Sequence, residues 1–225
     1  MVIMAVRRQR VERRADALSK ERIVEAAIEI LDADGESALT FRALAARLAT
    51  GSGAIYWHVA NKDELLAATT NDVIARVMTE AVGEPHEAIR AIALGMFDAI
   101  DAHPWVGAQL SREPWQLAML RIFEAVGGPL RTLGVPERAQ FNCASALVNY
   151  ILGVAGQNAA NARLVTAGTD RAAFLGGLAD QWARLDADEY PFVRQIAAGL
   201  PEHDDRDQFL AGIDLILTGI DALIP

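Results

Sequence analysis

The fold is decided by a stretch near the start of the chain, residues 39–66, which read LTFRALAARLATGSGAIYWHVANKDELL. After Thr40, a suitable helix cap, apolar residues recur at the spacing of one helix face: Phe41, Leu44, Ala45 and Leu48. Thr50-Gly51 ends that helix, and Ser52 begins a second one that is barely two turns long. Two short helices joined by a glycine-containing turn predict a helix-turn-helix, whose second helix enters the DNA major groove.

Helical signals continue on both sides of this stretch. A longer helix is predicted before it, with Ser19 as N-cap, Gly35 as stop and one apolar stripe: Ile23, Ala26, Ala27, Ile30 and Leu31. After it, Asn61 stands three residues ahead of Glu64, which is typical of a capping box at the start of a further helix. We therefore expect a DNA-binding domain over residues 19–66.

The charge is distributed unevenly along the 225 residues. The formal net charge is -9, which taken alone argues against nucleic acid as a partner. Residues 1–62, however, hold ten of the 21 basic and only eight of the 30 acidic residues. Five arginines lie between Arg7 and Arg14 with only Glu12 to oppose them. Residues 1–18 are therefore interpreted as a flexible basic arm that can lie along a phosphate backbone, the alternative being a merely solvated terminus.

Composition excludes several classes of protein. With 52% hydrophobic residues the chain can bury a sizeable core, so it is not a disordered tail. The single cysteine, Cys143, can form neither an internal disulfide nor a cysteine-based zinc site, which fits a reducing cytoplasm. Apolar residues precede the first arginines, contrary to a secretory signal. The most apolar run, residues 143–156, is too short for a bilayer span, so no membrane segment is expected.

The remainder, residues 67–225, is predicted to be a second all-helical domain, which makes the whole chain all-α. Glycine and proline mark its expected breaks: Gly83-Glu84-Pro85, His103-Pro104, Glu113-Pro114, Gly127-Gly128-Pro129, Gly134-Val135-Pro136 and Gly199-Leu200-Pro201. A helix over about residues 136–165 carries one apolar stripe: Ala144, Leu147, Val148, Ile151 and Ala155. The last helix carries another: Phe209, Ile213, Leu217 and Ile220.

The residues around the helix-turn-helix resemble those of the tetracycline-repressor (TetR) family. The likeness is carried by residues 39–45 and Leu48, and above all by the run Tyr56-Trp57-His58-Val59-Ala60-Asn61-Lys62, which is close to the tetracycline repressors proper. It is strong over about residues 19–70 and weaker over residues 95–160. The resemblance implies a regulator whose DNA-binding head is joined to a helical domain for effector binding and dimerisation.

The resemblance also implies which residues meet DNA: Thr40, Arg42, Ser52, Gly53, Ala54, Tyr56, Trp57, His58 and Lys62. Arg42 can pair with a guanine, although a solvated surface arginine is the alternative, and Ala54 can touch a thymine methyl group. Trp57 is expected to be largely packed in the core. Because Gly53 and Ala54 replace larger polar side chains of the tetracycline repressors, we expect a different operator, read partly through DNA shape.

In the family, the helix over residues 136–165 and the last helix form a four-helix bundle with a second subunit. The resemblance thus implies a homodimer, whose two-fold symmetry suits a palindromic operator. The alternative is that both apolar stripes pack within one subunit.

A pocket for an unidentified small molecule is expected between the helices of the second domain. The candidates for its lining are His103, Trp105, Gln109, Trp115, Met119, Phe123, Phe141, Asn149, Tyr150, Gln157 and Asn158. Each of them can equally be a core or surface residue. Asn149 and Gln157 are the sharper candidates, because they lie on the same side of an apolar helix and burying an unpaired amide is costly.

His103 stands near the place of a histidine that binds drug-chelated magnesium in tetracycline repressors. The other two positions on the metal side are Asn149 and Gln157, and neutral amides replace an imidazole and a carboxylate poorly around a hard cation. We therefore expect no metal and no cofactor, and we expect that magnesium-tetracycline is not the effector.

Together these patterns predict a ligand-responsive transcriptional repressor. The principal alternative is an architectural or partner-controlled DNA-binding protein without a small-molecule ligand. A membrane-surface protein that uses the arginine arm is disfavoured, because no amphipathic helix accompanies the arm. An enzyme is also disfavoured: Cys143 lies in an apolar helix, no catalytic motif is present, and the four histidines are scattered in sequence.

Overall fold

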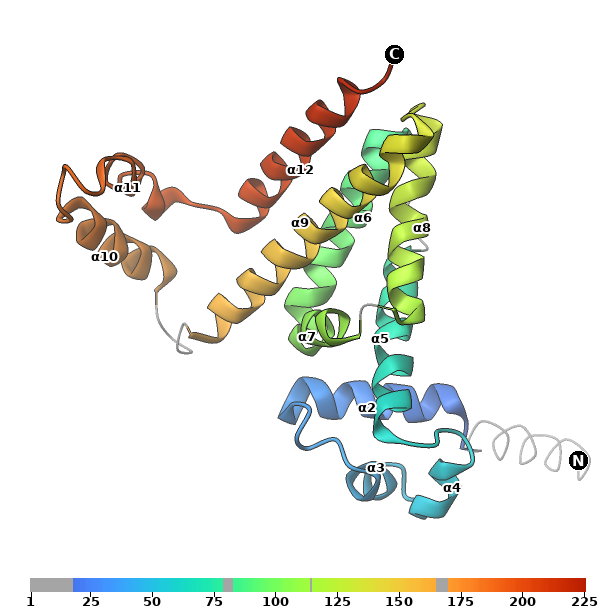
Figure 1. Ribbon diagram of the computed structural model, residues 1–225. Helices are drawn as coiled ribbons and strands as arrows, with labels where there is room; N and C mark the ends of the chain where they lie inside the picture. The colour runs from blue at the N-terminus through green and yellow to red at the C-terminus, as the bar shows by residue number, and fades with distance from the viewer. Residues whose placement is uncertain (1–17, 79–82, 114, 165–169) are drawn as a thin grey trace, which may run out of the picture. The chain divides into compact units, whose positions relative to one another are not determined.

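The computed structural model describes residues 18–78, 83–113, 115–164 and 170–225, and within these ranges the chain forms helices and loops without a strand (Figure 1). The predicted all-α class is confirmed. The predicted basic arm, apart from residue 18, lies outside the described residues. None of the helices in these ranges is both long and apolar enough to cross a membrane.

The chain divides into two compact units. Among the described residues, those up to 78 and those of 102–122 make up the first, and those of 83–101 and 123–225 make up the second. Residues 102–122 thus group with the helix-turn-helix, whereas the sequence assigns them to the effector domain. The functional boundary at residue 66 stays a prediction.

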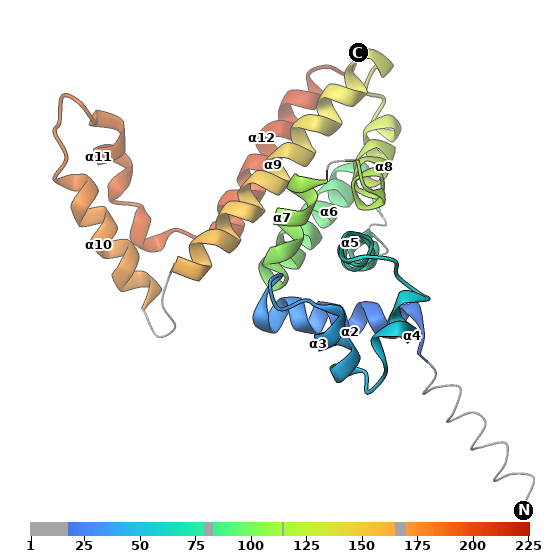
Figure 2. The same cartoon turned by 60° about the horizontal axis from the view of Figure 1, so that its bottom comes forward.

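The first unit holds the helix-turn-helix together with longer helices that lie above it in Figure 1 (see also Figure 2). Its members are α2 (Lys20–Asp34), α3 (Phe41–Arg47), α4 (Ser52–Tyr56), α5 (Lys62–Met78), α7 (Pro104–Arg112) and the first turns of α8 (Leu117–Thr132). Helix α2 packs against α3, α5 and α7. Fully buried side chains from these elements form the core: Ile23, Leu39, Leu44, Ile55, Leu65, Ile74 and Leu110.

The predicted ends of α2 and the predicted start of α5 are confirmed. The Ser19 side chain accepts a hydrogen bond from the Arg22 N–H at 3.3 Å, and Gly35 ends α2 with a φ of 76°. At the start of α5, the Asn61 side-chain oxygen accepts from the Glu64 N–H at 2.8 Å, while the Glu64 carboxylate accepts from the Ala60 N–H at 2.9 Å. Each cap satisfies N–H groups that the first helical turn leaves unpaired.

The turn between α3 and α4 places its left-handed residue at Ala49, with a φ of 51°. The Thr50 N–H donates to the Ala45 carbonyl at 2.9 Å and the Ala49 N–H to the Ala46 carbonyl at 3.3 Å. This pattern of two bonds is a Schellman ending, which usually has glycine at the left-handed position. Gly51 instead has a φ of -86° and caps α4.

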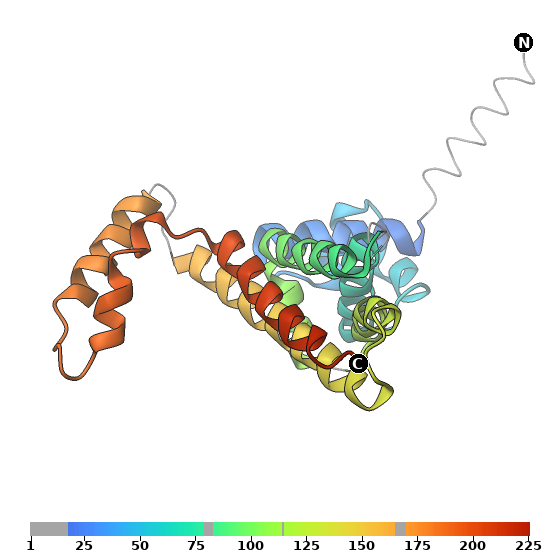
Figure 3. The same ribbon diagram turned by 90° about the horizontal axis from the view of Figure 1, so that it is seen from above.

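The second unit is built along two long helices. It comprises α6 (Pro85–Ala102), the rest of α8, α9 (Glu137–Leu164), α10 (Arg171–Ala183), α11 (Pro191–Ala197), the 3-10 helix η1 (Leu200–Glu202) and α12 (Asp205–Asp221). Helices α9 and α12 lie side by side (Figure 1 and Figure 3), and α10 packs on α11 and η1. The predicted helix over residues 136–165 is confirmed to within one residue at each end.

Both apolar stripes that the family would place in a dimer bundle are already buried within the single chain. Every member of the α9 stripe and of the α12 stripe is at least nine-tenths buried. Phe209 of α12, for example, packs its ring 4.8 Å from the ring of Phe97 on α6. These stripes therefore form part of the core of one subunit. Dimerisation through the same helices stays a prediction.

The break predicted at Gly127-Gly128-Pro129 is wrong. Helix α8 continues through Pro129 to Thr132. A proline inside a helix loses one backbone hydrogen bond and crowds the preceding turn. Here Val126 and Leu130, four residues apart and fully buried, keep one face of the helix in the core across that point. Their burial, together with the nearness of the helix end, offsets the cost of the proline.

A break between α10 and α11 escaped the sequence analysis. The side chain of Asp186 accepts hydrogen bonds from the N–H groups of Asp188 and Glu189 at 2.9 and 3.0 Å, which turns the chain ahead of Pro191. These two bonds lower the pKa of the Asp186 carboxyl. The only sequence signal for this break is Asp186 five residues before Pro191, and no glycine accompanies it.

The Tyr150 side chain of α9 lies against the backbone of α12 at Gly212. A Cβ atom on this residue would lie 1.9 Å from the Tyr150 hydroxyl oxygen. That hydroxyl donates to the Phe209 carbonyl at 3.2 Å, and the Tyr150 ring stacks on the Phe209 ring at 5.7 Å between centroids. Only glycine at position 212 leaves room for this arrangement.

Candidate functional site

The surface of α3 and α4 presents several of the residues expected at a DNA interface. Arg42 is exposed on α3 and forms no ion pair with a described residue. Gly53 is also exposed, and a Cβ atom built on it would meet nothing within 4 Å. Ser52 and Ala54 are half-buried. Thr40 caps α3, its hydroxyl oxygen accepting from the Ala43 N–H at 3.1 Å.

Two aromatic residues at the end of α4 face outward. The Tyr56 ring lies flat on the Phe41 ring of α3, with centroids 4.3 Å apart and planes 3° from parallel. Tyr56 remains half exposed, so the stack fixes the ring without covering it. Trp57 is 90% exposed, and the expectation that it packs in the core is wrong. Ile55 and Val59 are buried instead, and Trp57, two residues from each of them, points in the opposite direction.

Lys62 is tied to the loop that follows α2. Its ammonium donates to the Glu36 carbonyl oxygen at 2.7 Å. The Glu36 carboxylate in turn accepts two hydrogen bonds from the Arg112 guanidinium, at 3.1 and 2.5 Å. These bonds from Arg112 lower the pKa of the Glu36 carboxyl. The loop is thus held by α5 on one side and by α7 on the other. His58 is half-buried.

His103 and Trp105, expected to line an effector pocket, both bind one carboxylate of α2. The Asp32 Oδ1 atom lies 2.8 Å from His103 Nδ1 and accepts from the Trp105 indole N–H at 2.7 Å. Trp105 is buried, whereas His103 and Asp32 retain partial exposure. In this structure the two residues therefore join α7 to α2.

The remaining effector candidates do not share one cavity among the described residues. Trp115 is 88% exposed, Met119 is buried, and the Phe123 and Phe141 rings stack at 6.2 Å with Phe141 largely exposed. The hydroxyl of Tyr150 is bound to the α12 backbone. Gln109 is buried beside a cavity of the first unit, and Gln157 and Asn158 line one in the second.

Asn149 and Gln157 are exposed on α9. Because they are eight residues apart, they lie about 80° from each other around the helix. Asn149 points to solvent, and Gln157 lines a cavity. The argument that these amides are buried and need partners is therefore wrong. The stripe of apolar residues on the opposite face takes the buried position.

A cavity of about 390 Å³ lies between α9, α10 and α12. One part of its wall is apolar and is formed by Val154, Phe174, Leu175 and Leu178. The other part is polar and is formed by Gln157, Asn158, Asn161, Arg171, His203, Asp205 and Gln208. Its volume falls within the range of ordinary small-molecule sites.

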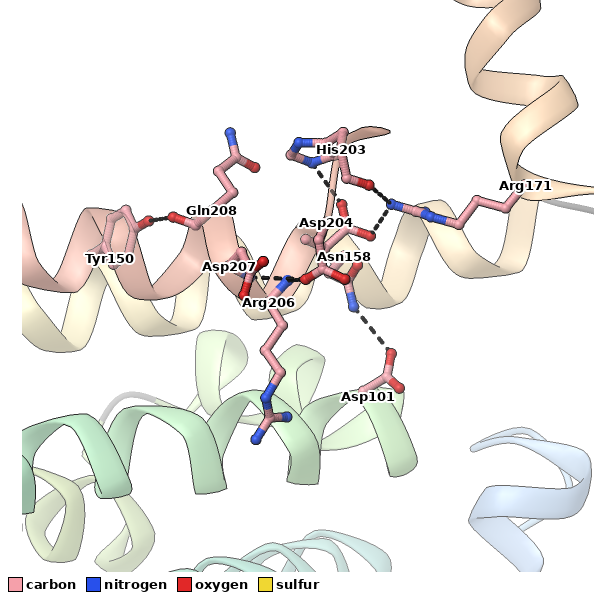
Figure 4. A network of polar contacts seen from close by, with 10 residues as sticks. Asp101, Tyr150, Asn158, Arg171, His203, Asp204, Arg206, Asp207 and Gln208 are labelled. Atoms are coloured by element: carbon pink, nitrogen blue, oxygen red, sulfur yellow. Dashed lines mark hydrogen bonds and ion pairs between the residues drawn. The ribbon is translucent and has the colours of Figure 1, made fainter. Parts of the chain in front are cut away.

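The charged groups of this cavity neutralise one another (Figure 4). Arg171 lies 2.7 Å from one carboxylate oxygen of Asp205, and His203 Nε2 lies 3.1 Å from the other. Asn158 donates to the Asp101 carboxylate at 3.1 Å. Next to them, the Asp204 side chain caps α12 by accepting hydrogen bonds from the N–H groups of Asp207 and Arg206. These bonds, and that from Asp207 most of all, lower the pKa of the Asp204 carboxyl. Sequence reasoning missed Arg171, His203 and Asp205, which no recognisable motif marks.

No group of three or more His, Cys, Asp or Glu side chains that could hold a metal ion occurs among the described residues. Cys143 is buried and unbonded.

Two comparisons with protein families cover most of the chain. Residues 23–69 match the family described as bacterial regulatory proteins, tetR family. Residues 82–224 match the tetracyclin repressor-like C-terminal domain.

Individual relatives agree with these matches. A solved transcriptional regulator of Streptomyces coelicolor, described as a TetR, is 52% identical with a TM-score of 0.86 over 93% of this chain and 100% of that chain. An HTH-type transcriptional regulator of Saccharopolyspora erythraea is 31% identical over 179 residues, which are 77% of this chain and 72% of the relative. The TetR family protein ActR of Streptomyces coelicolor, solved in complex with actinorhodin, is 25% identical with a TM-score of 0.75 over 90% of this chain and 95% of that chain.

Proposed function

Because the chain belongs to the tetR family of bacterial regulatory proteins, we propose that it is a transcriptional repressor controlled by a small molecule. It binds a palindromic operator as a homodimer and leaves the operator when an effector binds. The observation that carries the DNA-binding part is the outward surface of α3 and α4. There the exposed Arg42 guanidinium, which forms no ion pair with a described residue, lies near two exposed aromatic rings and a glycine.

Each of these groups has a distinct role at the operator. The Arg42 guanidinium pairs with a guanine edge, since its planar fork fits that base. Gly53 lets the backbone of α4 approach the groove closely. The Tyr56 hydroxyl, held by the Phe41 stack, donates to a phosphate, and the Trp57 ring contacts sugar or methyl groups. Lys62 uses one of its three donors on Glu36, which leaves two for a phosphate.

A selection of bound fragments from a random DNA library, at two salt concentrations, tests this interface. We expect an enriched palindrome. Arg42→Ala should weaken operator binding about tenfold or more and relax the preference at one base pair. Arg47→Ala is the matched control, because it removes the same charge from the same helix but from a guanidinium bound to Glu29 at 2.5 Å. Equal losses in the two variants, or retention without an enriched sequence, would favour the architectural alternative.

Dimerisation uses the faces of α9 and α12 that the single chain leaves exposed. Small and polar residues line the exposed side of α9: Asn142, Ala146, Asn149, Gly153 and Ala160. On α12, Leu215 is 76% exposed between Ala211 and Thr218. An exposed leucine among small residues suits close helix packing against a second copy. Leu215→Arg should give a monomer by analytical ultracentrifugation, whereas Phe192→Arg, at another exposed apolar residue, should leave the dimer intact.

The effector occupies the cavity between α9, α10 and α12. Its apolar wall and exposed amides, with the Arg171 charge balanced by Asp205, suit an uncharged, partly aromatic molecule. Actinorhodin is the first probe, because the relative ActR has been solved with it. Phe174→Ala should weaken probe binding, whereas Phe192→Ala should not. Magnesium-tetracycline is expected to leave the operator complex intact.

Control of DNA binding requires that the effector bind the free and operator-bound protein differently. A ligand shifts an equilibrium only by its difference in affinity for the two states, typically about 1 to 3 kcal/mol. Effector titrations with and without operator measure this difference. Equal dissociation constants would refute effector control while leaving the DNA-binding proposal untouched.

A further inference from the structure

A second cavity, in the first unit, has a chemistry unlike that of the effector cavity. It encloses about 300 Å³ between the start of α5 and the end of α7. We call it the Gln109 pocket. Its polar lining consists of Asp63, Glu64, Gln109, Arg112, Glu113 and Gln116, and Leu66 and Ala67 supply an apolar side. It shares no lining residue with the effector cavity.

Two amide oxygens at this pocket are buried and unpaired. Gln109 is only 4% exposed, and its side-chain oxygen has no hydrogen-bond partner among the described residues. The same is true of the Gln116 side-chain oxygen, whose amide nitrogen already donates to the Gln109 carbonyl at 3.2 Å. A buried acceptor without a donor is costly and is uncommon in folded proteins. No donor of the described residues therefore reaches these two oxygens.

The charges around these oxygens favour a cation. Three carboxylates line the pocket, those of Asp63, Glu64 and Glu113, against the single guanidinium of Arg112. That guanidinium is bound by the Glu36 carboxylate, which lies outside the lining. The Glu64 carboxylate already accepts hydrogen bonds from Lys20 and from the Ala60 N–H. The carboxylates of Asp63 and Glu113 attract the Arg112 guanidinium electrostatically and form no hydrogen bond or ion pair with a described residue. The lining thus offers acceptors and negative charge, and an incoming group must bring donors and positive charge.

We propose that the Gln109 pocket binds a small molecule bearing a protonated primary amine. An ammonium group carries three donors and no acceptor, which matches two amide oxygens together with a neighbouring carboxylate. A metal ion fits less well, because the described residues hold no group of three or more His, Cys, Asp or Glu side chains that could bind one. The apolar side formed by Leu66 and Ala67 accommodates the carbon chain of the amine.

This site is separate from the proposed effector site and does not depend on it. Its lining includes Arg112, whose ion pair with Glu36 holds the loop after α2. Occupation of the pocket therefore stabilises the unit that carries the helix-turn-helix, whether or not an effector is present in the other unit.

Calorimetric titration of the full-length protein with 1,4-diaminobutane tests the proposal, with butane-1,4-diol as the uncharged probe of the same shape. The diamine should bind at least about tenfold more tightly than the diol. Gln109→Leu, which removes an acceptor without altering charge, should weaken diamine binding about tenfold. Gln195→Leu on the exposed surface of α11 is the matched control and should change nothing.

Two outcomes would overturn the proposal. Equal diamine affinity in the wild type and Gln109→Leu, with binding lost in all variants at higher salt, would mean diffuse attraction to an acidic protein. Tighter binding of Mg²⁺ alone, in competition with the diamine, would mean a metal site. If Gln109→Leu fails to fold by circular dichroism, Gln116→Leu at a half-buried position provides the same comparison. Operator binding by the same variants is measured separately, so that failure here is distinguishable from failure of the repressor proposal.

Discussion

Replacing Gly212 with alanine is expected to disturb the contact between α9 and α12. The added Cβ atom would lie 1.9 Å from the Tyr150 hydroxyl oxygen, 2.3 Å from Cζ and 2.9 Å from Cε2. Such distances cannot persist, so the Tyr150 ring must move. The ring cannot move without giving up its bond to the Phe209 carbonyl and its stack on the Phe209 ring.

The size of the effect follows from these losses. The hydrogen bond contributes about 1 kcal/mol, the ring pair about 1 kcal/mol and the partial burial of the Tyr150 ring about 1 kcal/mol. Alanine in a helix offsets about 1 kcal/mol of this loss, because it is a better helix former than glycine. Gly212→Ala should therefore lower the free energy of unfolding by about 2 kcal/mol.

Urea unfolding followed by circular dichroism, at one fixed protein concentration, measures the change. Gly177→Ala is the control, because Gly177 lies within α10 and a Cβ atom there would meet nothing within 4 Å. It should raise the free energy of unfolding by up to about 1 kcal/mol. In a Tyr150→Ala background, Gly212→Ala should also become stabilising by about 1 kcal/mol.

The change of sign is the decisive result. A double-mutant cycle should give a coupling of about 3 kcal/mol between positions 150 and 212, because each single change removes the same contact. If Gly212→Ala destabilises the protein equally with and without the Tyr150 side chain, the close approach of α9 and α12 at this point is refuted.

Three further predictions concern the first unit. Ala49→Gly should raise the free energy of unfolding by about 0.5 kcal/mol in urea, because glycine relieves the left-handed backbone but costs more entropy on folding; a loss of stability would contradict the turn geometry. Arg112→Gln should raise the pKa of the Glu36 carboxyl toward its ordinary value. In the wild type this pair stabilises the fold at pH values above the ordinary pKa, and that stability should disappear as the pH falls through the lowered pKa. An NMR titration that finds the same Glu36 pKa in both proteins would contradict the pairing. Tyr56→Phe should weaken operator binding about fivefold in a fluorescence anisotropy assay by removing one phosphate contact, while Phe41→Ala should weaken it further by freeing the ring; unchanged affinity in both would remove Tyr56 from the interface.

Local sequence signals predicted the first unit well. Caps such as Ser19, Thr40 and Asn61 act within three residues of their position, so the sequence alone determines them. The orientation of Trp57 was also accessible, because Trp57 follows the buried Ile55 by two residues, which places the two side chains on different sides of a helical turn. We expected Trp57 in the core because its side chain is large and aromatic, but its position relative to Ile55 places it in solvent.

The second unit depends on contacts between distant segments, which periodicity does not reveal. The α9 and α12 stripes were recognised correctly as apolar, but spacing cannot distinguish a stripe buried in one subunit from a stripe between two. Similarly, Pro129 marks a break only where tertiary packing allows one. The candidates for an effector pocket were chosen by residue type, and their positions depend on which helices meet. The Arg171 and Asp205 pair at the cavity, for instance, joins two helices that the chain separates widely.

The contrast between Trp57 and Trp105 gives the protein two optical reporters of opposite character. The Trp57 indole stands in solvent at the end of α4, whereas the Trp105 indole is buried and donates to Asp32. A water-soluble quencher reaches the Trp57 ring, as it reaches the exposed Trp115 ring, and does not reach the Trp105 ring. Loss of quenching at Trp57 on addition of DNA therefore reports that the surface of α3 and α4 is covered. A red shift in the emission of Trp105 reports that α7 has separated from α2.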